Sequence, residues 1–189
     1  YVPDGLTIST MPPGKRGALI ITHDIDAQSS FENIDDFARL EKRYGTTSTI
    51  FLQTKYIDDY YDTDFMTLEN LSKMRKLASE GFEIASHTVS HTPHFPRLPL
   101  GEIVKDPDFY RPRIVSMTET VNATVRGEVW VSKSIISSNG MPPPRSFRTG
   151  HLVFNRYLVN VLKEAGYLYD SSMGVYHCAC NFPFRHNFK

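Results

Sequence analysis

The sequence of 189 residues lacks three features that would point to particular classes of protein: spaced cysteine pairs, long apolar runs and an excess of one charge. The only cysteines, Cys178 and Cys180, lie too close together for a framework disulfide and do not indicate a compartment. No apolar run approaches the roughly 20 residues of a membrane-spanning helix, so we expect no membrane span. Lysine plus arginine equals aspartate plus glutamate at 21 each, so we expect no nucleic-acid partner. A small or neutral substrate is the better expectation.

The length fits a single domain that buries about 70% of the surface of its unfolded chain. Residues 1–16 are rich in proline and glycine and are predicted to form an N-terminal arm. Residues 17–189 are then predicted to form one domain around one hydrophobic core.

A recurring order of helix, glycine and strand organises the chain. Apolar residues at helical spacing predict helices over residues 31–44, 68–78 and 157–165, and over all or part of 114–138. Short apolar and β-branched segments predict strands at residues 18–21, 46–52, 82–85, 146–147 and 167–169. Residues 93–112 contain five prolines and are predicted to form a long surface loop that walls the site. Repeated crossover units of this kind are typical of a parallel α/β sheet or barrel.

Reactive side chains follow several of the predicted strands. Asp24 and Asp26 follow the first strand, His87 the third, Arg148 the fourth and Asp170 the fifth. In folds of this kind the chemistry gathers at the carboxyl ends of the strands. We therefore expect these side chains to converge on one rim.

Two carboxylates, Asp24 and Asp26, are separated by a single residue. Burying them is costly without a partner, so they imply either a bound cation or a base whose charge a neighbour holds. His87 and His91 are four residues apart and would lie one above the other on a helical turn, which suits a single metal ion. Such a pair alone is as a rule unremarkable. With Asp26, however, it makes a three-ligand site with an open position, as in catalytic zinc sites.

Four short segments resemble, in order, the motifs of one family. Residues 22–26 resemble the spaced form of its first motif, a base aspartate followed by a metal-binding aspartate, and residues 87–91 match the second, His-Ser/Thr-x-x-His. Residues 147–151 are similar to the third, an arginine near a glycine, but lack its usual proline, and residues 169–172 resemble the fourth. The family is that of the polysaccharide deacetylases with the NodB-homology fold, carbohydrate esterase family 4. The resemblance covers most of the chain.

The resemblance implies an α/β fold, a distorted (β/α) barrel of the NodB type that is incomplete here at its C-terminus. It also implies one divalent metal ion, zinc by preference, with Asp24 as the base and Arg148 as the cation that holds this base. Asp170 is expected to help orient the catalytic acid, and a backbone N–H near Gly150 or His151 is expected to stabilise the oxyanion. The expected site residues are Asp26, His87 and His91 for the metal, Asp24, Arg148 and Asp170 for catalysis, and Gly150 and His151 for the substrate.

The function that the resemblance implies is metal-dependent removal of N-acetyl or O-acetyl groups from an amino-sugar polysaccharide, at or outside the cell surface. An acetylated glycan is then the expected substrate. The candidates for an aromatic wall that stacks on the sugar are Tyr56, Tyr60, Tyr61, Phe95, Tyr110 and Trp130.

One departure from the family concerns the fifth motif, whose histidine protonates the leaving amine. His177 and His186 are the only histidines after Asp170, and neither has the Leu-x-His setting of that motif. Three explanations stay open: the domain is incomplete, it uses a different acid, or the enzyme is impaired.

Two other functions also stay open. Domains of this kind can act on amides that are not sugars, and the residues around the metal do not separate the two substrates. A carbohydrate-binding domain that has lost its acid is the second alternative, although retention of both Asp24 and Asp26 favours chemistry. The His23–Asp24 doublet is shared with helical metal-dependent phosphohydrolases, but here it follows a β-branched segment, which argues against that class. The identity of the glycan and the oligomeric state are left open.

Overall fold

The computed structural model describes residues 14–15 and 17–173, so nearly all of the predicted arm, together with His177 and His186, lies outside the described residues. Five short strands form one sheet in the order β1-β2-β3-β6-β7, and every pairing is parallel. The strands are β1 (Thr22–Ile25), β2 (Thr49–Leu52), β3 (Glu83–Ser86), β6 (Ser146–Phe147) and β7 (Tyr169–Asp170). The predicted parallel α/β architecture is confirmed, and in the described part of the chain the sheet is open, with β1 and β7 at its edges.

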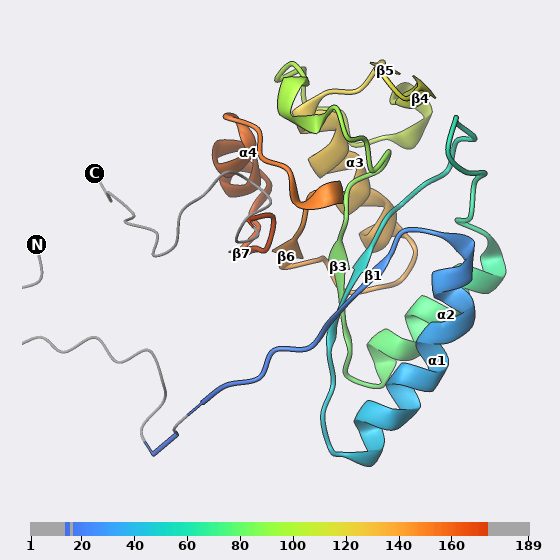
Figure 1. Ribbon diagram of the computed structural model, residues 1–189, viewed down its shortest axis with the longest axis vertical. Coiled ribbons are helices and arrows are strands. Elements are labelled where there is room, and N and C mark those ends of the chain that lie inside the picture. The colour runs from blue at the N-terminus through green and yellow to red at the C-terminus, as the bar shows by residue number, and fades with distance from the viewer. Residues whose placement is uncertain (1–13, 16, 174–189) are drawn as a thin grey trace, which may run out of the picture.

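Four α-helices, three short 3₁₀ helices (Phe95–Arg97, Pro107–Phe109 and Gly150–Leu152) and a small ribbon complete the described part of the chain. The α-helices are α1 (Gln28–Arg43), α2 (Leu68–Ser79), α3 (Val125–Ser138) and α4 (Leu158–Ala165). The ribbon pairs β4 (Arg113–Ser116) with β5 (Glu119–Val121) in antiparallel fashion. Figure 1 shows α1 and α2 side by side, α4 close to β7, and the ribbon at the top of the view. Among the described residues, no helix combines the length and the apolar character needed to cross a membrane.

The spacing of apolar residues explains where the helices form and which side of each is buried. α1 buries Phe31, Ile34 and Ala38, which recur every three or four residues, so one face of this helix packs into the core. α4 ends at Gly166, whose φ of 74° lies in the left-handed region that glycine adopts without steric cost. These two helices lie where the sequence predicts them.

Alternation along the strands separates the core from the face that carries the site. Ile25 and Ile50 are fully buried in the core that α1 and α2 cover. The parallel register pairs Asp24 with Phe51, and because successive side chains point to opposite faces, these two lie on the other face of the sheet. Asp26 follows Asp24 by two positions, so the same alternation directs both carboxylates to one side.

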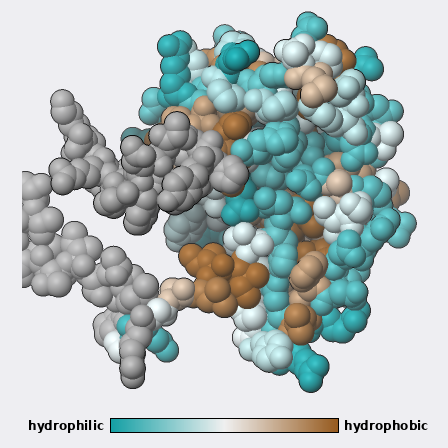
Figure 2. Space-filling view, in the orientation of Figure 1, coloured by the Kyte–Doolittle hydropathy of each residue, from teal (hydrophilic) through white to brown (hydrophobic). Residues whose placement is uncertain are grey.

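The prediction of a buried strand at residues 18–21 is wrong. Pairing with β2 begins at Thr22, and Leu19 and Ile20 are 85% and 82% exposed. Because the pairing of β1 with β2 starts at Thr22 and Thr49, the apolar residues before β1 have no strand beside them within the described residues. Figure 2 shows the segment that leads into β1 as a brown, apolar group on a mostly teal surface.

Only the second part of residues 114–138 is helical. The first part forms the ribbon, in which Ile114 pairs with Thr120, because β-branched residues fit an extended and paired backbone. α3 begins at Val125, where the hydroxyl of Thr124 accepts a hydrogen bond from the N–H of Gly127 over 3.0 Å. This cap fixes the start of the helix.

The core assignment can be tested by truncating one side chain. Ile50→Ala should lower the free energy of unfolding by about 2–5 kcal/mol, because it leaves a cavity among fully buried residues. Leu68→Ala is the matched control, since Leu68 is 83% exposed at the start of α2, and it should change stability by less than about 0.5 kcal/mol. Urea unfolding of both variants and the wild type gives the values. Equal losses in the two variants would contradict the assignment.

Candidate metal centre and active site

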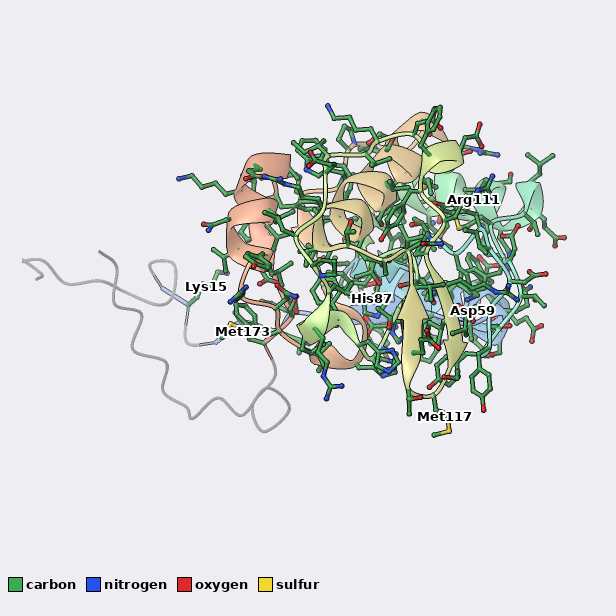
Figure 3. All side chains as sticks on the ribbon, turned by 90° about the horizontal axis from the view of Figure 1, so that it is seen from above. Lys15, Asp59, His87, Arg111, Met117 and Met173 are labelled. Atoms are coloured by element: carbon green, nitrogen blue, oxygen red, sulfur yellow. The ribbon has the colours of Figure 1, made fainter. Side chains whose placement is uncertain are left out.

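Three side chains from two strand ends meet in one cluster, which we call the ligand cluster. Asp26 follows β1 directly, and His87 and His91 follow β3. Each residue offers one ligand atom, and the three atoms lie within 4.8 Å of one another. Figure 3 shows His87 in the interior of the molecule, where it is 2% exposed. The structure thus brings together the residues that the sequence predicts as metal ligands.

Hydrogen bonding and burial leave the ring of His87 neutral, with one nitrogen free of a hydrogen bond. Its Nδ1 lies 2.9 Å from the carbonyl oxygen of Arg148 and donates a hydrogen bond to it. This bond fixes the tautomer and leaves Nε2 with a free lone pair, 3.7 Å from Oδ2 of Asp24. Burial lowers the pKa of His87 because a charged ring would be poorly solvated there, so the ring is neutral at pH 7.

His91 is held in the same neutral state. Burial, followed by the neighbouring rings of His87 and His151, lowers the pKa of His91 to about 2. Its ring centroid lies 4.8 Å from that of His87 and 4.5 Å from that of His151, and its Nε2 lies 3.7 Å from Oδ2 of Asp26. A metal ligand must be deprotonated, as both rings are here. Two imidazoles and one carboxylate form a donor set that fits a divalent cation such as zinc.

The turn that carries the two histidines is not the helical turn that their spacing suits. Thr88 and His91 have φ angles of 68° and 52°, in the left-handed region that a β-branched residue such as threonine adopts only at a steric cost. The N–H of His91 donates a hydrogen bond to Oγ1 of Thr88 over 3.2 Å. A tight irregular turn therefore brings the second ring to the cluster.

Gly150 gives the ring of His91 its space. A Cβ atom at position 150 would lie 2.6 Å from Cδ2 of His91, which is closer than side chains approach one another. His151 follows with a φ of 56°, and its ring packs on His91. Both residues predicted to meet the substrate therefore lie against the ligand cluster.

Asp24 has a different partner from Asp26. Its Oδ1 lies 2.6 Å from Nη1 of Arg148. Nη2 of Arg148 also donates hydrogen bonds to the hydroxyls of Ser171 at 2.8 Å and Thr22 at 3.2 Å. The side chain of Arg148 is 13% exposed and that of Asp24 is 35% exposed. An anchored cation thus holds one oxygen of Asp24, while the other lies beside the ligand cluster.

Asp170 lies close to these groups without joining them. Its Oδ1 accepts hydrogen bonds from the N–H and the hydroxyl of Ser172, at 2.9 and 2.5 Å. Its neighbours make the contacts instead, because Ser171 binds Arg148 and the hydroxyl of Ser172 accepts from the N–H of Thr149 at 3.0 Å. Asp170 therefore fixes the turn after β7, and its expected role in orienting an acid stays a prediction.

A pocket opens beside the ligand cluster, with Asp26 and His91 in its wall. Much of the remaining wall comes from residues 53–62, which follow β2. Lys55 and Asp59 form an ion pair there, and their side chains are 4% and 2% exposed. The pocket therefore combines the candidate ligands with further polar and charged groups.

The predicted wall and its aromatic residues are only partly right. Of residues 93–112, Pro93 lines the pocket, but Phe95 and Tyr110 are only 1% and 4% exposed and cannot stack on a sugar. Tyr61 is 53% exposed and is the one aromatic candidate that lines this pocket in the described part of the chain.

Sequence reasoning missed several residues that support the site. Thr22, the first residue of β1, and Ser171, directly after β7, both accept hydrogen bonds from Arg148. The signal for them in the sequence was a hydroxyl near a predicted strand. The ring centroid of Phe51 lies 4.1 Å from Cζ of Arg148. Only the register of β2 against β1 places this ring there. Glu128 is buried in α3, and its signal was a charge on an otherwise apolar helix face.

Comparison with a family profile identifies a relationship over most of the chain. The profile described as polysaccharide deacetylase matches residues 12–169. The chain matches none of the curated proteins with which it was compared.

Several solved structures share the fold. A family 4 carbohydrate esterase from Streptomyces lividans in complex with acetate is 19% identical with a TM-score of 0.54, over 82% of this chain and 62% of that chain. The Streptococcus pyogenes deacetylase PplD in complex with acetate is 14% identical with a TM-score of 0.55, over 82% and 55%. The Xyl-CE4 domain of a multidomain xylanase from the hindgut metagenome of Trinervitermes trinervoides is 18% identical with a TM-score of 0.50, over 79% and 55%. These likenesses confirm the predicted fold, and the chain spans 55% to 62% of the length of the structures that it matches.

The close fit of Gly150 against His91 leads to a prediction about metal affinity. Gly150→Ala should weaken Zn²⁺ binding by about 10- to 100-fold, the range seen when groups that support metal ligands are changed, because the new methyl group meets the imidazole. Gly17→Ala is the control, since a Cβ atom there meets nothing within 4 Å. Calorimetric titration of metal-depleted protein with Zn²⁺ measures both. Equal affinities for all three proteins would contradict the packing argument.

The neutral histidines lead to a prediction about pH. Burial lowers the pKa of His87 and His91 in the fold, whereas in the unfolded chain they take up protons near pH 6.5. The metal-free protein should therefore have its full stability above about pH 6.5, where both rings are neutral in the folded and in the unfolded chain. Below that pH it should lose about 1.4 kcal/mol per pH unit for each proton taken up on unfolding. Urea unfolding between pH 7 and 5 measures this slope, which should be smaller by one proton in His91→Asn; an unchanged slope would show that His91 is already charged in the fold.

Proposed function

Because the chain belongs to the polysaccharide deacetylase family, we propose that it uses a divalent metal ion to hydrolyse acetyl groups of an amino-sugar polysaccharide. The observation that carries this proposal is the separation of two neighbouring carboxylates. Asp26 lies with His87 and His91, whereas Asp24 is held by Arg148. A domain that only binds glycan has no need of an anchored carboxylate beside its ligand cluster, whereas a hydrolase needs both a ligand and a base.

Asp26, His87 and His91 are the proposed metal ligands. Their neutral rings, the free Nε2 of His87 and the mutual distances within 4.8 Å all support this assignment. A divalent cation held there would supply a Lewis acid that polarises the acetamide carbonyl and makes water a better nucleophile. Three protein ligands also leave a position open, as catalytic sites require.

Asp24 is the proposed general base. Arg148 holds Oδ1 of Asp24 and so fixes the direction of the carboxylate, while Oδ2 stays available to accept a proton from the attacking water. Base catalysis of this kind typically contributes about 100- to 10,000-fold to the rate. That proton ends on the amine nitrogen when the bond between the carbonyl carbon and this nitrogen breaks, so the products are acetate and a free amine.

The turn after β6 is proposed to stabilise the oxyanion. Gly150 and His151 lie against His91, and their backbone N–H groups are the proposed donors. Donors fixed in place before the reaction cost no reorganisation when the negative charge develops. The left-handed backbone of His151 contributes to this arrangement because it turns the chain back at the rim of the site.

The glycan part of the proposal is supported by the family and by one exposed ring. Tyr61 lines the pocket, and its ring centroid lies 5.2 Å from that of Tyr60 in an edge arrangement. An exposed aromatic face beside a polar pocket suits the apolar face of a pyranose. Two of the similar solved structures are complexes with acetate, which is the product that the proposal expects here. Action at or outside the cell surface belongs to the same proposal.

Two matched variants test the division of roles. Asp24→Asn should keep Zn²⁺ affinity close to the wild type and lower the rate of acetate release by about 100- to 10,000-fold, because it removes the base and keeps the ligands. Asp26→Asn should lower metal affinity first and activity as a consequence. Metal content by mass spectrometry and acetate release from acetylated chito-oligomers measure the two effects. If both variants lost metal equally, the division would be wrong.

A panel of substrates distinguishes an acetylated glycan from a non-sugar amide as the substrate. Acetylated chito-oligomers and peptidoglycan fragments should release acetate, whereas simple anilides and cyclic amides should not. Metal binding without acetate release from any glycan, together with turnover of a non-sugar amide, would favour the amidohydrolase alternative. Metal binding with no turnover at all would favour a carbohydrate-binding role.

A further inference from the structure

Glu128 is an acidic residue in the middle of the core. It belongs to α3, is 0% exposed, and lies outside the ligand cluster. Its Oε2 accepts hydrogen bonds from the N–H groups of Val89 at 2.8 Å and Ser90 at 2.9 Å. Its Oε1 accepts from the hydroxyls of Ser90 at 2.8 Å and Tyr110 at 2.9 Å. Each oxygen of this buried carboxylate therefore has two donors, and all of them are uncharged.

Three of these bonds end on the turn between the two candidate ligand histidines. Val89 and Ser90 lie between His87 and His91, and their consecutive N–H groups point at the same oxygen, which is the pattern of a backbone anion site. The turn also contains Thr88 in a left-handed conformation. A conformation of this kind persists only where its surroundings determine it, and Glu128 is the group that satisfies the middle of the turn.

α3 is shaped to admit this network. A Cβ atom at Gly127 would lie 2.0 Å from Cε2 of Tyr110, so only glycine lets the ring of Tyr110 lie against the helix. Glycine weakens the interior of a helix, and here it allows the hydroxyl of Tyr110 to reach Glu128. The same hydroxyl accepts a hydrogen bond from the N–H of Thr124 over 3.2 Å, directly before α3. Tyr110 therefore fixes the carboxylate from an element other than the turn.

We propose that Glu128 is a positioning residue that sets the geometry of the two metal-binding histidines by holding the turn between them. This inference rests on the proposed function, since it takes His87 and His91 as ligands. A carboxylate suits the task because both of its oxygens accept hydrogen bonds. A glutamine of the same shape offers only one accepting oxygen, so its NH₂ group would face either the two backbone N–H groups or the two hydroxyls, and that pair would lose its acceptor.

Metal affinity separates this role from a purely structural one. Glu128→Gln should weaken Zn²⁺ binding by about 10- to 100-fold, as measured by competition with a chromogenic chelator. The visible absorption bands of the Co²⁺-substituted variant should also differ from those of the wild type, because they report the geometry of the ligands. Ser90→Ala removes one donor and keeps both backbone bonds, so it should show a smaller loss in the same direction.

Glu41→Gln is the matched control, because Glu41 is another buried glutamate, 7% exposed, whose partner is His23 on the far side of the sheet. It should lower the melting temperature and leave both Zn²⁺ affinity and the Co²⁺ spectrum unchanged. Wild-type affinity and spectrum in Glu128→Gln would overturn the inference, and if that variant does not fold, unchanged values in Ser90→Ala would do the same. A wild-type protein that binds no Zn²⁺ would instead refute the proposed function and the inference with it.

Discussion

Arg148 is the residue on which the arrangement of the site depends, because it contacts β1 and the end of β3 at once. Its carbonyl oxygen accepts the hydrogen bond that fixes the tautomer of His87, and its guanidinium holds Asp24. The N–H of Arg148 also donates to the carbonyl oxygen of Ser86, the last residue of β3, at 2.9 Å. One residue after β6 thus positions both a candidate metal ligand and the proposed base. Asp24 in β1 and Asp26 directly after it have different surroundings, because only Asp24 meets this arginine.

The ligand cluster combines ordinary strand geometry with an irregular turn. Alternation along β1 brings Asp24 and Asp26 to one face at no conformational cost. The second histidine is different, because His91 reaches the cluster only through a turn with left-handed residues, packed against a glycine and a buried carboxylate. Backbone strain of this kind is stored at functional sites and is stabilised by the packing around them. In this protein the stabilising contacts come from α3 and from the turn after β6.

Local patterns in the sequence predict the parallel α/β fold and the candidate ligands Asp26, His87 and His91, and the resemblance to the family adds the other expected site residues. Helical spacing, glycine caps and the residues at strand ends are all visible along the chain. Contacts between distant segments are not visible in this way. Ser90 and Glu128 are 38 residues apart, and periodicity cannot place one on the other. The exposed Leu19 and Ile20 illustrate the same limit, because an apolar segment that favours an extended backbone does not determine whether a second strand lies beside it.

The central claim is that neighbouring aspartates have separate roles, one as a metal ligand and one as a base held by arginine. The most direct measurement is the anomalous diffraction of crystals grown with Zn²⁺, which locates the metal independently of any assay. The account predicts zinc bound by Asp26, His87 and His91 at about 2.0–2.2 Å, with Asp24 outside the coordination sphere and still on Arg148. Zinc coordinated by Asp24, or bound away from the two histidines, would contradict it.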